Sequence, residues 1–136
     1  MKTNRKLVLA VLVGMAIGVA GAVAIHAQQA KAAPAYMIGE VDVTDPATFQ
    51  KYGEKVPATL APFNGHFLVR VGKTQTLEGD APKRMVVIAF DSMEQAQAWY
   101  DSPAYAAIKP IRQSAAKSRL FIVEGVAPQL LPIESR

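Results

Sequence analysis

The sequence contains no cysteine, which excludes disulfide bonds, thiol nucleophiles, iron–sulfur clusters and cysteine-based zinc sites. It has two histidines in 136 residues, His26 and His66, and His26 lies close to the N-terminus. One remaining histidine does not supply the ligands of a structural zinc site. The sequence also lacks a phosphate-binding loop and a serine–histidine–aspartate triad with recognisable spacing. We therefore expect no metal and no cofactor.

Acidic residues are absent from the first part of the chain. All 11 Asp and Glu follow Ala33, whereas four of the 15 Lys and Arg precede it. The 11 basic side chains that remain are balanced by the 11 acidic ones, so the net charge of +4 belongs to the N-terminal segment. The rest of the chain has no overall attraction for phosphate backbones, and we expect no nucleic-acid partner.

Residues 1–32 have the order of a secretory signal. Met1–Lys6 is positively charged, an uncharged stretch runs from Leu7 to Ile25, and small residues follow. The Ala30-Lys31-Ala32 run predicts cleavage after Ala32, with cleavage after Ala27 as the alternative. The uncharged stretch could also stay in place as an inner-membrane anchor, the one case in which a membrane is a partner. Either outcome predicts an exported domain, most simply in the bacterial periplasm.

The remaining chain predicts one α+β domain, residues 33–126, followed by a C-terminal tail, residues 127–136. Alternating or continuous apolar residues predict four strands, at 35–42, 65–72, 84–90 and 118–126. Capping residues predict helices that begin after Asp45, Ser92 and Ser102. Pro57 and Pro110 fall inside two of these helices, where we expect bends or interruptions. The order β-α-β-β-α-β predicts a ferredoxin-like antiparallel sheet with its helices on one face.

The third predicted strand, 84–90, carries apolar residues on both of its faces. The helices cover one face of such a sheet, so the other face also needs a cover. A domain of this size without disulfides finds that cover most simply in a second copy of itself. The sequence therefore predicts a homodimer in which the two sheets pack face to face.

Several motifs between Tyr36 and Gly125 resemble one bacterial family, the domain of unknown function DUF 1330. The resemblance is carried by Asp45-Pro46, residues 61–70 (APFNGHFLVR), residues 77–79 (LEG), residues 90–94 (FDSME), residues 99–105 (WYDSPAY), Arg112, Arg119 and Glu124-Gly125. It implies a dimeric α+β barrel of ferredoxin-like protomers and no established activity. The sequence departs from the usual motifs at His66, Val71 and Ala104, where arginine, glycine and glutamate are frequent.

His66 and Arg70 are candidate functional residues on the second predicted strand. Strict alternation would place them on one face of that strand, together with Leu68. His66 could act as a general base or as an axial haem ligand, or it could be a solvated residue where the strand begins. Arg70 could bind a ligand anion, or it could form an internal ion pair with Glu40 or Glu124.

Two aromatic residues complete the candidate ligand-binding set. Trp99 and Tyr105 could line a pocket, but their helical spacing beside Ala96 and Ile108 is also typical of core residues. Two further arginines, Arg112 and Arg119, are expected to be solvated or paired.

Three functions are compatible with this pattern. The first is an exported dimer of unassigned activity that holds a small ligand in a cleft between sheet and helices. The second is a cofactor-independent monooxygenase or isomerase, with His66 as base and Arg70 as anion clamp, because proteins of this fold include such enzymes. The third is haem binding through His66. Since fold does not determine chemistry, the sequence leaves open whether the protein is an enzyme.

Overall fold

Four strands form one antiparallel sheet in the computed structural model, which describes residues 31–128. The strands are β1 (Ala35–Val43), β2 (His66–Val69), β3 (Met85–Phe90) and β4 (Ala116–Glu124). Their order across the sheet is β2-β3-β1-β4. The predicted ferredoxin-like α+β class is confirmed by this order. The predicted signal segment lies almost wholly outside the described residues, as does most of the C-terminal tail.

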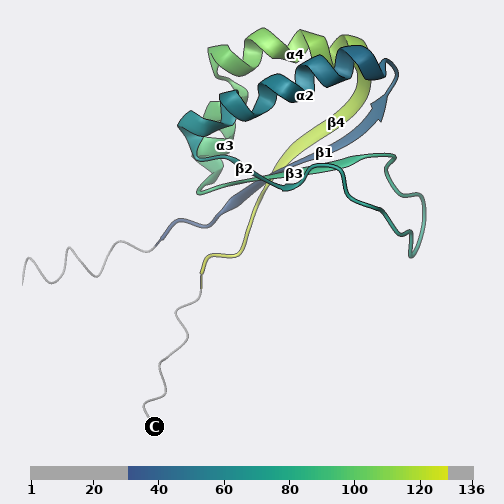
Figure 1. Cartoon of the computed structure of the whole chain (residues 1–136). Coiled ribbons are helices and arrows are strands. Elements are labelled where there is room, and N and C mark those ends of the chain that lie inside the picture. The colour runs from purple at the N-terminus through teal and green to yellow at the C-terminus, as the bar shows by residue number, and fades with distance from the viewer. Residues whose placement is uncertain (1–30, 129–136) are drawn as a thin grey trace, which may run out of the picture. The chain divides into compact units, whose positions relative to one another are not determined.

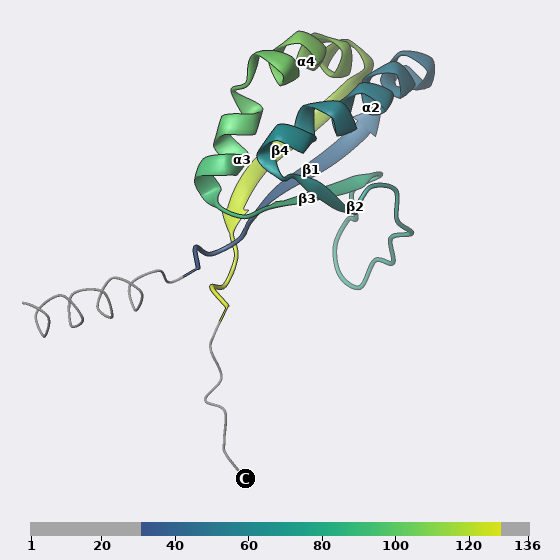
Figure 2. The same ribbon diagram turned by 60° about the vertical axis from the view of Figure 1, so that its left-hand side comes forward.

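The helices lie together over one face of the sheet (Figure 1). They are α2 (Pro46–Leu60), α3 (Met93–Tyr100) and α4 (Pro103–Ala115), and the short 3-10 helix η1 (Ala61–Phe63) follows α2. The view in Figure 2 shows the same two layers from another side. Each helix begins where the sequence predicted, because the side chains of Asp45, Ser92 and Ser102 accept a backbone N–H from the first turn.

The two internal prolines, at which bends or interruptions were expected, do not interrupt their helices. Pro57 lies within α2 and Pro110 within α4, and both helices continue past them. A proline has no N–H, so Pro57 leaves the carbonyl of Gly53 without its helical donor. Arg70 Nη2 donates to that carbonyl oxygen at 2.9 Å. The lost helical hydrogen bond is thus replaced from outside the helix.

The core lies between the sheet and the helices. Trp99, Tyr105, Phe90 and Ile88 are its largest fully buried side chains. The indole Nε1 of Trp99 donates to Thr59 Oγ1 at 3.0 Å, so the one tryptophan is buried with its polar atom satisfied. The third predicted strand is β3, and it lies inside the sheet between β2 and β1 as expected.

The second predicted strand is shorter than expected. The sequence predicts it over residues 65–72, whereas β2 ends at Val69. The following segment, 70–84, extends beyond the sheet (Figure 1), and Val71 and Leu77 are 73% and 87% exposed. No strand in the described part of the chain faces these side chains, so their apolar character alone did not make a strand.

The second face of the sheet is not covered by any helix of residues 31–128 (Figure 1). Register places Tyr36, Ile38 and Glu40 of β1 beside Val123, Phe121 and Arg119 of β4 on this open face. Phe121 is 43% exposed, which is high for a large apolar side chain in a sheet. None of the helices within the described residues has the length and apolar character that a bilayer crossing requires.

Candidate functional site

A cavity of about 530 Å³ lies between α2 and the helix-facing side of the sheet. Its floor is formed by β1, β3 and β4, and its roof by α2. Most of its lining is apolar. The apolar lining residues include Gly39, Val41, Phe49, Val56, Phe67, Val86, Ile88 and Leu120.

The charged residues at the cavity are mostly basic. Arg70, Arg84 and Arg112 border it, against Glu54 as the one carboxylate of its lining within residues 31–128. The guanidinium carbon of Arg84 is 5.2 Å from the ring centroid of Phe49, and that of Arg70 is 4.9 Å from the ring centroid of Phe67. A concave, weakly polar site with an excess of positive charge attracts anions more strongly than an open surface does.

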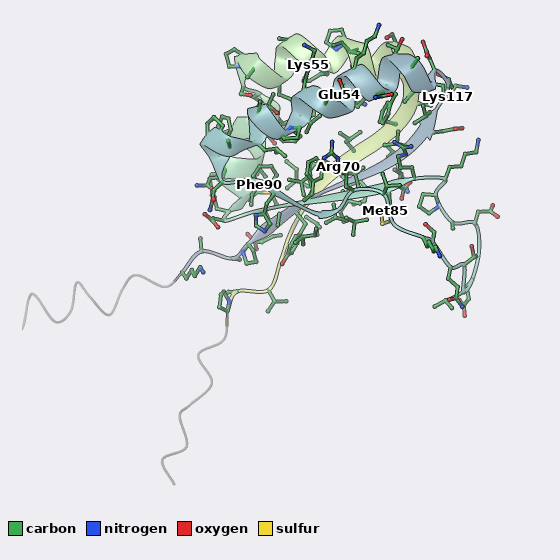
Figure 3. The ribbon with its side chains drawn as sticks, in the orientation of Figure 1. Glu54, Lys55, Arg70, Met85, Phe90 and Lys117 are labelled. Carbon is green, nitrogen blue, oxygen red and sulfur yellow. The ribbon has the colours of Figure 1, made fainter. Side chains whose placement is uncertain are left out.

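Arg70 lies between the sheet and α2, with Glu54 on the helix above it (Figure 3). Its guanidinium group donates to the Gly53 carbonyl at the cavity border. The expected ion pair of Arg70 with Glu40 or Glu124 is not formed, and this prediction was wrong. Glu40 instead accepts two hydrogen bonds from Arg119, at 2.8 and 3.0 Å, and this contact holds the pKa of Glu40 below its usual value.

Arg112 is the buried charge of the site. It lies in the last turn of α4, the residue is 7% exposed, and its buried Nε has no hydrogen-bond partner. The ion pairs within residues 31–128 join Lys83 to Asp42 and Arg119 to Glu40, and neither includes Arg112. The expectation that Arg112 is solvated or paired was therefore wrong, whereas Arg119 is paired as expected.

The location of Arg112 offsets part of the cost of burying its charge. A cation in the last turn of a helix interacts favourably with the helix dipole, by up to about 2 kcal/mol when partly buried. Removal of an ion from water costs several kcal/mol even after relaxation. The dipole of α4 is thus too weak to compensate fully. Arg112 borders both the apolar cavity and a polar hollow of about 370 Å³ between α4 and β4.

The phenol of Tyr52 lies near Arg112 in the cavity wall. Its hydroxyl is 3.1 Å from the hydroxyl of Tyr105, and either group can be the donor. Burial raises the pKa of Tyr52 well above its usual value, and Tyr105 adds to that effect, while the guanidinium of Arg112 acts in the opposite direction. Tyr52 therefore remains a neutral hydrogen-bonding group at physiological pH.

His66 lies on the other side of the sheet from the cavity. It pairs with Ala89, which also pairs with Tyr36 on the open face, and its side chain is exposed. A β-bulge between Phe67 and Val69 shifts the alternation by one residue. The expectation that His66 and Arg70 share a strand face was wrong for this reason, and they do not meet in one site of the described protomer.

Trp99 and Tyr105, the other predicted ligand-binding residues, are both 0% exposed. Neither lines the cavity, and both pack within the core beside Ala96. Among residues 31–128, no three His, Asp or Glu side chains gather as metal ligands. Arg112 was not among the candidate ligand-binding residues, although its helical spacing with Tyr105, Ile108 and Ala115 already indicated the buried face of a helix.

The sheet order and the single helical layer define a ferredoxin-like α+β protein. The model of a domain of unknown function, DUF1330, matches residues 34–126, and the chain belongs to this family. No curated protein matches the chain. The family assignment therefore agrees with the resemblance seen in the sequence and does not supply an activity.

Solved structures with the same fold are distant in sequence. A protein of unknown function from Rhodopseudomonas palustris is similar with a TM-score of 0.58 and 16% identity, over 79% of this chain and 94% of that one. SnoaB, a cofactor-independent oxygenase from Streptomyces nogalater, has a TM-score of 0.52 and 18% identity, over 74% and 99%. A dimeric ferredoxin-like protein of unknown function from Thermobifida fusca has a TM-score of 0.50 and 16% identity, over 71% and 95%. At these identities the likeness concerns the fold alone.

Proposed function

We propose that this protein is an exported homodimer that binds a small, largely apolar molecule in the cavity of each protomer. The observation that carries the proposal is the cavity itself. Its volume of about 530 Å³ is in the range of small-molecule sites, and its lining is apolar with a few polar groups at defined places. A concave, largely apolar space that is open to solvent is the usual form of a small-molecule site.

The proposal of a homodimer is based on the open face of the sheet. Ile38, Phe121 and Val123 form an apolar surface there, and a second copy would cover it through the same residues of both protomers. The similar Thermobifida fusca protein, described as dimeric, supports this arrangement by analogy of fold.

The proposal of export is based on the sequence of residues 1–32 alone. We propose cleavage after Ala32, with Ala27 as the second site and an inner-membrane anchor at residues 7–25 as the other outcome. The intact mass of protein recovered from the cell envelope distinguishes the three cases. A chain that stays in the cytoplasm at full length would contradict export.

The binding proposal is tested by filling the cavity. Gly39 lies in its floor, and a Cβ added there would meet the nearest side-chain atoms at 3.8 Å or more. We expect Gly39→Leu to fold, to raise the melting temperature, and to weaken binding of a neutral naphthalene-type probe by more than about tenfold. Binding is measured by calorimetry. The matched control is Gly72→Leu, at an exposed glycine outside the cavity lining where an added Cβ would be 3.6 Å from its nearest neighbour, and this variant should leave binding unchanged.

Unchanged probe binding in a folded Gly39→Leu variant would refute the cavity as the site. Absence of binding by the wild-type protein at millimolar probe would count against the whole proposal.

The alternative function is a cofactor-independent monooxygenase or isomerase. The fold that this chain shares with the Streptomyces nogalater oxygenase favours it, and the largely apolar cavity would suit an apolar substrate. The proposed base, His66, lies on the open face, whereas the proposed anion clamp, Arg70, borders the cavity. Binding is favoured over catalysis for this reason. Turnover that is lost in His66→Ala would reverse the preference, and a Soret band that depends on His66 would indicate haem binding instead.

A further inference from the structure

We propose that the ligand of the cavity is an organic anion, with an apolar body in the cavity and an acid group held by Arg112. This inference rests on the proposed function and adds the chemical class of the ligand. It also assigns Arg112 a binding role that the sequence did not indicate.

The first observation is the state of Arg112. The residue is more than nine-tenths buried, it forms no ion pair with a carboxylate of residues 31–128, and its Nε is buried without a hydrogen-bond partner. Buried arginines otherwise have such partners, because an uncompensated buried charge is strongly unfavourable. Since residues 31–128 place no acid here, a ligand acid group is the partner that we infer for Arg112.

The second observation is the charge around the cavity. Arg70 and Arg84 border the same space, and the carboxylate of Glu54 belongs to an exposed residue that already accepts a hydrogen bond from Gln50. The cavity lining therefore has more positive than negative groups. An anionic ligand would reduce this imbalance, whereas a cationic one would increase it.

The third observation is the neutral phenol of Tyr52 beside Arg112. If Tyr105 donates to Tyr52, the hydroxyl of Tyr52 is free to donate to a ligand oxygen. A carboxylate accepts several such hydrogen bonds at once, and a guanidinium group and a phenol are both suitable donors. The apolar residues of the cavity then contact the rest of the molecule.

The polar hollow on the other side of Arg112 offers a competing occupant. It is lined by Tyr100, Gln113 and Ser118, and Ser118 Oγ is buried without a hydrogen-bond partner. A small inorganic oxyanion would fit that lining better than an organic one would. We favour the organic anion because the larger space that Arg112 borders is the apolar cavity.

The test compares two probes of the same shape, naphthalene-2-carboxylate and naphthalene-2-carboxamide, at pH 7 by calorimetry. The wild-type protein should bind the carboxylate at least about tenfold more tightly than the amide. Arg112→Met should remove this preference while it retains binding of the amide. The matched control is Arg119→Met, an arginine on the open face with no contact to the cavity, which should keep the preference.

Each outcome separates the two proposals. Equal affinities for the two probes in the wild-type protein overturn the anion inference and leave the binding function intact, and this readout does not require any variant to fold. A preference for the carboxylate that persists in Arg112→Met also overturns it. Inorganic phosphate that binds more tightly than the carboxylate, and loses this binding in both Arg112→Met and Ser118→Ala, would place the anion site in the polar hollow and overturn the organic anion. If neither probe binds, the proposed function is refuted, and the anion inference, which depends on it, is refuted as well.

Discussion

At the scale of single residues, Gly65 shows how closely the chain packs where β2 begins. A Cβ at this position would lie 2.6 Å from Phe90 Cε1 and 2.8 Å from Leu60 Cδ2, and both of those side chains are buried. We expect Gly65→Ala to lower the free energy of unfolding by about 1–3 kcal/mol, because neither side chain has space to move into. Chemical denaturation measures this change.

The matched control is Gly53→Ala, where the new methyl group meets no atom within 4 Å. Alanine is favoured over glycine inside a helix, so this variant should gain roughly 0.5–1 kcal/mol. Equal effects of the two substitutions would contradict the close packing at Gly65.

The candidate site could be predicted only in part from the sequence, as two arginines illustrate. Helical spacing placed Arg112 on a face with Tyr105 and Ile108, so its burial was predictable. Whether a carboxylate lies opposite depends on which strands and helices meet, and no local pattern contains that information. For Arg119, the β1–β4 register supplies Glu40 as its partner, whereas Arg112 receives none.

The faces on which the side chains of β2 lie were also difficult to predict from the sequence. Alternation puts every second side chain on the same face, so one extra residue reverses the assignment of all that follow. The bulge between Phe67 and Val69 has this effect, and it separates His66 from Arg70. Nothing in the residues His66–Arg70 marks the bulge, since there is no glycine among them.

At the scale of elements, α2 and the end of β2 are joined by one hydrogen bond. Pro57 deprives the Gly53 carbonyl of its helical donor, and Arg70 supplies another. We expect Arg70→Met to cost about 1 kcal/mol of unfolding free energy in the natural sequence. In a Pro57→Ala background, the restored N–H can donate to Gly53, so the same substitution should cost distinctly less. A double-mutant cycle by chemical denaturation measures the difference.

Arg84→Met is the control for this cycle. Arg84 also lies over an aromatic ring at the cavity, that of Phe49, and no hydrogen bond connects it to α2 among the described contacts. It should show no coupling to Pro57. Additive effects of Arg70→Met and Pro57→Ala would contradict the compensating role of Arg70.

Element starts were easier to predict than element ends. A helix start depends on one capping side chain and its own first turn, so Asp45, Ser92 and Ser102 each identified a start. The end of a strand depends on where its partner ends. β2 stops at Val69 and β4 begins at Ala116 rather than the predicted Ser118, because Ala116 pairs with Val43 of β1.

At the scale of the whole molecule, the sheet has unequal faces. One face is covered by α2, α3 and α4 (Figure 1). The other face presents apolar side chains of β1 and β4. A sheet packed on one side only can remain stable when its outer face is polar. Here Ile38, Phe121 and Val123 interrupt that polarity, which favours a second copy of the chain over solvent as the cover.

The dimer is tested at Phe121, which lies on the open face in the edge strand β4 and pairs with Ile38 of β1. A charge there would appear twice in a symmetric interface, once from each protomer. We therefore expect Phe121→Glu to weaken dimerisation by at least about 100-fold and to leave the circular dichroism spectrum of the protomer unchanged. Sedimentation velocity at micromolar concentration measures the effect. Leu77→Glu is the matched control, since Leu77 is 87% exposed in segment 70–84 and contributes to neither the sheet nor its cover. A monomeric wild-type protein, or a Phe121→Glu variant that dimerises as well as Leu77→Glu does, would show that the open face is not the interface.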